Sequence, residues 1–153
     1  MASMIAAIES FAQQGARVVT AVGAKAANEL LFVERANASG EVHIATDDGS
    51  RGFAGFVPAL AGKLVDREKF DQILTCGPER MMKAVLDLAR AHKIPIQASL
   101  ERYMKCGIGI CDACSLDDQL VCVDGPIFTA EQLDGFEEFG KFRRDKSGRR
   151  IAA

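Results

Sequence analysis

No long hydrophobic run occurs in this sequence of 153 residues. Its apolar stretches are short and are interrupted by charged side chains, so a membrane-spanning helix is not expected. The first fourteen residues have neither the basic segment nor the uninterrupted apolar stretch of a secretory signal peptide. We therefore expect a cytoplasmic protein, in a reducing compartment where clustered cysteines usually bind metal or perform redox chemistry.

Basic residues are missing from one long stretch. Between Cys106 and Gly140 there are eight acidic residues and no lysine or arginine, whereas residues 141–153 carry six basic residues and one acid. A basic tail can bind nucleic acid, but the acidic body of the chain favours a solvated, mobile C-terminus, and no nucleic-acid partner is expected. His43 and His92 have no partner at metal-ligand spacing, and we interpret them as structural or surface residues.

Helical periodicity alternates with short β-branched runs along residues 3–100. Helices are predicted over 3–14, 25–38, 54–63 and 78–93, and strands over 16–23, 41–46, 70–78 and 94–100. The apolar face of the last helix is formed by Met82, Val85, Leu86 and Ala89. This alternation indicates an α/β fold, with a parallel sheet and helices on both faces. Such sheets bind ligands at the carboxyl ends of their strands, which here carry glycine and other small residues.

Four of the five cysteines lie within seventeen residues. They are Cys106, Cys111, Cys114 and Cys122, with spacing C-x4-C-x2-C-x7-C. Structural zinc sites usually have two C-x2-C pairs separated by a dozen or more residues. The spacing found here is instead that of plant-type [2Fe–2S] proteins. Gly107 and Gly109 would let the loop wrap around a cluster and turn backbone N–H groups toward the sulfurs. The spacing favours a [2Fe–2S] cluster, with structural zinc and disulfides as alternatives.

Two further groups have weaker signals. Cys76, in the strand end TCGPERMM, is on general grounds more often a small core residue than a reactive thiol. Asp47 and Asp48 could form an acid/base pair, but DDGS is typical of turns in which Asp side chains bond nearby backbone amides. We favour the turn, with contact to a ribose as the second interpretation.

The segments TCGPERMM, SLERYMKCGIGICDAC and VCVDGPIF together resemble the electron-transfer subunit of B-type dihydroorotate dehydrogenase, a branch of the ferredoxin–NADP reductase superfamily. The resemblance covers about residues 4–133. Members of this family have an FAD-binding barrel, a nicotinamide-nucleotide domain and a C-terminal [2Fe–2S] loop. The resemblance implies an NAD-linked iron–sulfur flavoprotein subunit that moves electrons between NAD(H), FAD and the cluster. It further implies a hetero-oligomer with a catalytic subunit that contains FMN, working in pyrimidine biosynthesis.

The resemblance also implies a role for each matching residue. It makes the four clustered cysteines the cluster ligands and assigns no catalytic residue. The residues that it places at the nucleotide are Gly23, Thr46, Asp47, Asp48, Gly49, Ser50, Cys76, Gly77, Pro78 and Glu101.

The chain departs from the family at its N-terminal side. It contains no FAD barrel, and the first strand of the nucleotide domain, with the glycine-rich turn that binds the pyrophosphate, is missing. The chain therefore looks like the C-terminal portion of a longer protein. Its expected parts are a partial NAD-binding domain (1–100), a cluster-binding segment (101–128) and a C-terminal tail (129–153). We expect weak or no NAD binding, no retained FAD, and no activity of this portion by itself.

Three alternatives remain. The gamma subunit of sulfhydrogenases and the small subunit of electron-bifurcating NAD(P)H–ferredoxin oxidoreductases share this architecture. In the bifurcating subunit the first ligand is commonly aspartate, so Cys106 and the short loop before Cys122 favour the dihydroorotate dehydrogenase branch. The alternative of another class is a zinc-stabilised interaction module that reuses the fold without electron transfer.

Overall fold

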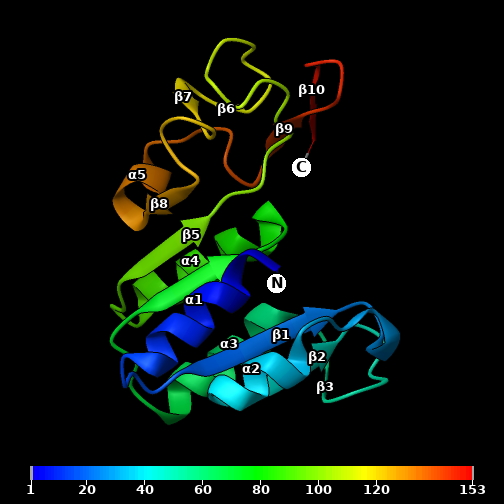
Figure 1. Cartoon of the computed structure of the whole chain (residues 1–153), viewed down its shortest axis with the longest axis vertical. Coiled ribbons are helices and arrows are strands. Elements are labelled where there is room, and N and C mark those ends of the chain that lie inside the picture. Colours follow the sequence, from blue (N-terminus) through cyan, green and yellow to red (C-terminus); the bar gives the residue numbers. More distant parts are fainter. Residues whose placement is uncertain (1, 153) are drawn as a thin grey trace. The chain divides into compact units, whose positions relative to one another are not determined.

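The structure, a computed structural model, describes residues 2–152. The chain forms two compact units that divide between Lys69 and Phe70, and each unit is described by itself (Figure 1). The sequence pattern instead placed a first boundary after residue 100. The difference arises because the strand over residues 96–99 and the segment that follows it share one hydrophobic core. None of the helices in the described part of the chain has the length and apolar character to cross a bilayer.

The first unit contains a parallel sheet of three strands. Its elements are α1 (Ala2–Gln13), β1 (Val19–Ala24), the 3-10 turn η1 (Ala27–Glu29), α2 (Val33–Ser39), β2 (Glu41–Thr46), β3 (Phe53–Ala54) and α3 (Val57–Arg67). The strand order is β1-β2-β3, and both pairings are parallel. Parallel pairing along β1 and β2 confirms the predicted βαβ organisation of this region.

Helices cover both faces of this sheet. On one face, Ile5 and Ile8 of α1 and Ala36 of α2 form a small core against Val42 of β2. Gly23 lies on the other face, where a Cβ atom would come within 2.1 Å of the Val57 side chain of α3. Glycine at this strand end is therefore needed for α3 to approach the sheet.

The second unit contains one larger sheet and two hairpins. Its elements are β4 (Ile73–Cys76), α4 (Glu79–Ala91), β5 (Ile96–Ser99), β6 (Ser115–Leu116), β7 (Gln119–Leu120), β8 (Ile127–Thr129), α5 (Ala130–Asp134), β9 (Phe142–Arg144) and β10 (Arg150–Ala152). In the sheet β4-β5-β8, β4 and β5 are parallel and β8 is antiparallel. The strands β6 and β7 form one antiparallel hairpin and β9 and β10 the other.

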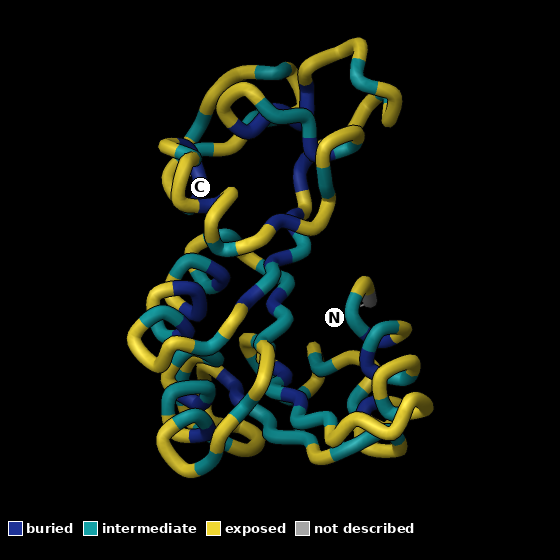
Figure 2. Tube along the Cα trace, turned by 90° about the vertical axis from the view of Figure 1, so that its left-hand side faces the viewer, coloured by how far each residue is buried: buried dark blue, intermediate teal, exposed yellow. Residues whose placement is uncertain are grey.

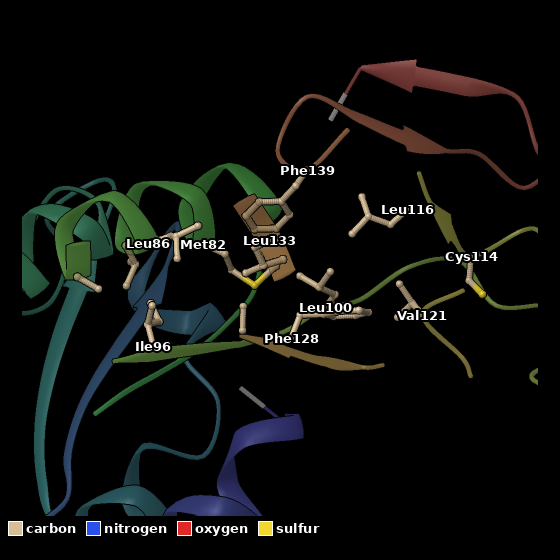
Figure 3. Close-up of a cluster of buried hydrophobic side chains, with 13 residues drawn as sticks. Met82, Leu86, Ile96, Leu100, Cys114, Leu116, Val121, Phe128, Leu133 and Phe139 are labelled. Atoms are coloured by element: carbon tan, nitrogen blue, oxygen red, sulfur yellow. The ribbon is translucent and has the colours of Figure 1, made fainter. Parts of the chain in front are cut away.

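The core of the second unit extends from α4 and β5 into the cysteine segment. It contains all four apolar residues predicted for the face of α4, together with residues from β5, β6, β8 and α5. Figure 3 shows Cys114, Leu116 and Val121 in the same buried cluster as Phe128 and Phe139. Figure 2 shows buried stretches of the chain separated by exposed ones. In the loop from Cys106 to Cys111 no residue is buried. The cysteine segment is therefore anchored on a hydrophobic core, although its loop is exposed.

Two predicted elements differ from the structure. The helix predicted over 25–38 is only α2, because the chain is extended at Leu30 and Phe32 takes a left-handed conformation (φ 60°) before the helix begins. The helix predicted over 54–63 begins at Val57 and continues to Arg67, with Pro58 in its first turn. The described part of the expected C-terminal tail (129–153) contains α5 and the β9–β10 hairpin, and Leu133 and Phe139 in it are buried.

Candidate metal centre

The β6–β7 hairpin brings Cys114 and Cys122 together. Ser115 pairs with Leu120 across the hairpin, and the Val121 N–H donates to the Cys114 carbonyl over 3.4 Å. The two cysteines therefore flank the open end of the hairpin, one before β6 and one after β7. Their thiols are hydrogen-bonded, and this contact, together with burial, raises the pKa of Cys122 above its ordinary value.

The loop from Cys106 to Cys111 forms the second pair of thiols. Gly107 and Gly109 have left-handed backbones (φ 69° and 80°), which a residue with a Cβ atom adopts only with strain. This path turns backbone N–H groups inward, and the Ile108 N–H lies 3.5 Å from the Cys106 sulfur. Hydrogen bonds from the N–H groups of Ile108 and Ile110, and then from the Cys111 thiol, lower the pKa of Cys106 to about 6.

Two pairs of thiols fit a [2Fe–2S] cluster better than a single metal ion. None of the five cysteines is in a disulfide. Among residues 2–152, no three His, Cys, Asp or Glu side chains are arranged to hold one metal ion. A [2Fe–2S] cluster needs a different donor set, four thiolates shared between two irons. The four thiols suit a cluster of this kind because they form two pairs, Cys106–Cys111 and Cys114–Cys122. The pairs are close to each other, since Cys122 interacts electrostatically with Cys106.

A buried ion pair is hydrogen-bonded to the main chain of the cysteine segment. The Arg102 Nε atom lies 2.6 Å from Oε1 of Glu79, and the two side chains are 2% and 9% exposed. A second nitrogen of Arg102 donates to the Ser115 carbonyl over 3.3 Å, directly after the candidate ligand Cys114. Neither residue was found from the sequence, because a charged residue in a local pattern does not reveal a partner 23 positions away.

The candidate nucleotide residues of the first unit form a tight turn at the end of β2. The Thr46 hydroxyl is buried and is bonded to both N–H and C=O of Arg51. The Ser50 hydroxyl and the Ser50 backbone N–H both donate to the Asp48 carboxylate. These two bonds lower the pKa of Asp48, and the bond from the hydroxyl has the larger effect. The favoured turn interpretation of this loop is therefore present in the structure. Gly49 (φ 73°) completes the turn, and Asp47 is exposed beside it.

The candidate nucleotide residues of the second unit meet at the end of β4. The Cys76 thiol donates to the Glu101 carboxylate over 3.5 Å. Gly77 has φ 147°, and Pro78 caps the N-terminus of α4. The structure thus places Cys76 and Glu101 together, and their contact with a nucleotide stays a prediction, as it does for Gly23 and residues 46–50.

The cysteine segment matches a known family. Residues 101–134 match the iron–sulfur cluster binding domain of dihydroorotate dehydrogenase B. Over 152 residues the chain is 49% identical to a protein of Methanocaldococcus jannaschii named "Probable dihydroorotate dehydrogenase B (NAD(+)), electron transfer subunit". The chain is thus similar over nearly its whole length to electron transfer subunits of this name, and its cysteine segment matches their iron–sulfur domain. An iron–sulfur cluster binding domain is thus shown for the segment that carries the four thiols.

Other relatives agree with this family and show how much of it the chain spans. A protein of the same name from Methanothermobacter thermautotrophicus is 44% identical over 99% of this chain. The chain spans 59% and 57% of the lengths of these two relatives. A solved structure, described as an NADH-dependent reduced ferredoxin–NADP oxidoreductase of flavin-based electron bifurcation, is 32% identical with a TM-score of 0.74. That similarity covers 86% of this chain and 49% of the other, and confirms the oxidoreductase-type α/β fold.

Proposed function

We propose that this chain holds a [2Fe–2S] cluster on Cys106, Cys111, Cys114 and Cys122 and serves as a one-electron relay in a dihydroorotate dehydrogenase B. The observation that carries the proposal is the arrangement of four thiols in two pairs inside the matching iron–sulfur domain. When bound, such a cluster supplies reversible one-electron transfer. No residue of this chain is proposed to make or break bonds in the organic substrate.

The chain's own groups would bind and tune the cluster. The Ile108 N–H that approaches the Cys106 sulfur would stabilise negative charge on a ligand thiolate. The same bonds keep Cys106 largely ionised near neutral pH, which favours metal binding because thiolate is the binding form. The hairpin β6–β7 would fix the other two sulfurs through backbone pairing rather than through flexible loop contacts.

The surface of the cysteine loop supports a role in docking to a redox partner. Ile108, Ile110 and Val123 are 69%, 79% and 58% exposed, each within two positions of a proposed ligand. Acidic residues flank them and no basic residue lies between 106 and 140. We propose that this face meets the FMN-containing catalytic subunit in a cytoplasmic complex. The parent protein would supply FAD and bind NAD(H). Residues 46–50 of the first unit are candidate nucleotide contacts in their own unit, and residues 76–78 and Glu101 are the candidates in the second.

Electron transfer to a flavin partner tests this function. The chain is reconstituted anaerobically with iron and sulfide, reduced chemically, and mixed with the FMN-containing catalytic subunit of a dihydroorotate dehydrogenase B. Bleaching of the FMN absorbance with one electron delivered per cluster is expected, and a Cys111→Ser chain prepared in the same way should deliver none. A cluster that forms but never reduces this flavin would overturn the proposed partner.

A second candidate is a relay in an electron-bifurcating oxidoreductase. The solved structure that matches with a TM-score of 0.74 favours it, since that protein is described as part of such a system. The experiment above separates the two if the flavoprotein partner of a bifurcating complex is added in a parallel reaction. Faster reduction of that partner than of the dihydroorotate dehydrogenase subunit would favour the second candidate. A sulfhydrogenase partner would be recognised by a third reaction of the same design.

A further inference from the structure

We propose that Arg144 is a positioning residue for the iron–sulfur site, acting through Ser115 to hold the main chain next to Cys114 and to raise the reduction potential of the cluster. This inference rests on the proposed function, because it assumes a cluster on the four cysteines. Arg144 lies in the C-terminal hairpin, ten residues beyond the end of the matched iron–sulfur domain at residue 134. Neither the cysteine pattern nor the matched domain assigns it a role.

The first observation is a direct contact. The Arg144 Nε–H donates to the Ser115 hydroxyl oxygen over 2.5 Å. Ser115 is 2% exposed, so this hydrogen bond is shielded from water. Ser115 directly follows the proposed ligand Cys114 and is the first residue of β6. Any displacement of Ser115 therefore also moves the proposed ligand Cys114, because one peptide bond joins the two residues.

The second observation is that Ser115 is held from two sides. Its carbonyl accepts from Arg102, which is itself fixed by the buried carboxylate of Glu79. Its hydroxyl accepts from Arg144. Main-chain and side-chain oxygens of one residue thus bind guanidinium groups from two distant parts of the sequence. These two hydrogen bonds restrict the backbone and side-chain conformations of Ser115, and they thereby restrict the backbone position of the adjacent Cys114.

The third observation is that the hairpin carrying Arg144 is anchored. The Glu138 N–H donates over 3.3 Å to Asp117, in the turn between β6 and β7. The Glu138 carboxylate lies 3.0 Å from Arg150 Nε on β10. Phe139 is buried in the core that also contains Cys114 (Figure 3). The segment just before β9 therefore contacts the turn of the β6–β7 hairpin, it is tied to β10 through Arg150, and β9 itself contacts Ser115.

The charge of Arg144 gives this contact an electronic consequence. Its hydrogen-bond acceptors are Ser115 Oγ and the Gly148 carbonyl, both neutral. Within the described residues, no hydrogen-bonded carboxylate cancels the guanidinium charge. Reduction adds a negative charge to a four-thiolate cluster, and a nearby half-buried cation stabilises the reduced form more than the oxidised form. Loss of this cation is therefore expected to lower the potential.

The same hairpin offers a matched control. Arg143 carries the same charge one position earlier, and its side chain is exposed because neighbouring strand residues point to opposite faces. Arg143→Gln removes one charge from the hairpin without touching Ser115. Ser115→Ala removes the hydroxyl and leaves both arginines in place, so it keeps the test informative if Arg144→Gln folds poorly.

The first measurement uses the metal-free chain. Hydrogen exchange of the Val121 amide, which bonds to the Cys114 carbonyl, reports on the open end of the β6–β7 hairpin. Arg144→Gln and Ser115→Ala should each speed this exchange roughly fivefold, the effect of losing about one hydrogen bond, and the double variant should add little. Arg143→Gln should match the wild type. Equal exchange in Arg144→Gln and Arg143→Gln overturns the positioning role.

The second measurement uses the loaded chain. In a potentiometric titration followed by EPR, Arg144→Gln should shift the ratio of reduced to oxidised cluster roughly tenfold toward oxidised, about 59 mV for a one-electron couple. Arg144→Lys, which keeps the charge, should recover most of the shift, and Arg143→Gln should leave the wild-type potential. A wild-type chain that takes up no iron and sulfide overturns the proposed function and the tuning with it. If the chain binds a cluster and the Arg144→Gln variant has the wild-type reduction potential, only the proposed effect of Arg144 on the potential is overturned.

Discussion

At the scale of single residues, the clearest chemical signal is the Cys106 thiol. Its pKa is lowered from 9.0 to about 6 by backbone N–H groups of Ile108 and Ile110, which favour the thiolate. The ionised form is therefore favoured by folding: its stabilisation is complete above the ordinary thiol pKa and is lost as the pH falls through about 6. The glycines that make this loop possible can be read from the sequence, but the lowered pKa of Cys106 cannot, because it depends on where the backbone N–H groups point.

Alkylation of the metal-free chain tests this acidity. At pH 7 Cys106 should react with iodoacetamide faster in the folded chain than in the same chain unfolded in urea, because the thiolate is the nucleophile and folding lowers the pKa of Cys106. Its rate should fall by half near pH 6, and peptide mass spectrometry assigns the modified cysteine. A midpoint for Cys106 near 9 would show that the backbone N–H groups do not stabilise its thiolate.

The buried Arg102–Glu79 pair makes a second prediction at this scale. Arg102→Met leaves the Glu79 carboxylate without its ion pair, with a side chain only 9% exposed, and should lower the free energy of unfolding of the second unit by about 3 kcal/mol. Tyr103 is the only tyrosine in a chain without tryptophan, so its fluorescence reports on this unit during urea unfolding.

The matched control for Arg102 lies on α4, the helix that carries its partner Glu79. Lys83 and Asp87 form an exposed ion pair on α4, and Lys83→Met should change the free energy of unfolding by less than about 0.5 kcal/mol. Equal losses for the two variants would mean that burial does not distinguish the pairs. The identity of Arg102 as a buried residue could not be predicted, because its partners lie on α4 and β6 and not within its own segment.

At the scale of elements, the loop from Cys106 to Cys111 depends on its two glycines in different ways. Both have left-handed backbones. A Cβ atom at Gly107 would meet nothing within 4 Å, whereas one at Gly109 would come within 2.9 Å of Val123 Cγ2. Gly107→Ala should therefore cost only backbone strain, about 1 kcal/mol, and Gly109→Ala should cost more.

The two alanine variants are best compared directly. Thermal unfolding followed by Tyr103 fluorescence should show a lower midpoint for Gly107→Ala than for the wild type, and a lower one still for Gly109→Ala. The iron content after reconstitution should fall in the same order. A Gly107→Ala chain as stable as the wild type would contradict the claim that the left-handed backbone at this position requires glycine.

Long, strongly periodic elements were predictable, and elements defined by distant contacts were not. The α4 helix and its four buried apolar residues follow from local periodicity. The helix predicted over 25–38 was interrupted because Phe32 adopts a left-handed backbone that no local pattern indicated. The hairpins β6–β7 and β9–β10 have strands of two or three residues, which are too short for a periodic signal. Their positions depend on Ser115, Asp117 and Glu138 contacts between segments.

At the scale of the whole molecule, the two compact units have separate cores and separate candidate sites. The four proposed ligands lie in the second unit, whereas Gly23 and residues 46–50 lie in the first. The spacing of the cysteines predicts that all four are cluster ligands, and that assignment stays a prediction; the spacing did not predict which thiols lie in pairs. It could not predict that residues 129–152, expected as a tail, pack on the cysteine segment, since Phe139 and Arg144 have no distinguishing local pattern.

Cluster loading should therefore protect one unit selectively. A group bound only by the native state stabilises the region that holds it, so hydrogen exchange should slow across residues 106–144 when the cluster is incorporated. Exchange in β1 and β2 of the first unit should change little. Equal protection of both units would place the effect of loading outside the cysteine segment.

The central claim is that the four clustered cysteines hold a [2Fe–2S] cluster, and metal analysis combined with EPR tests it most directly. Protein purified anaerobically should contain about two irons and two acid-labile sulfides per chain, and one-electron reduction should produce the EPR signal of a paramagnetic cluster. Cys122→Ser, which removes one ligand from the β6–β7 pair, should lower both contents. Stoichiometric zinc, no labile sulfide and no EPR signal after reduction would contradict the account and leave a zinc-stabilised module in its place.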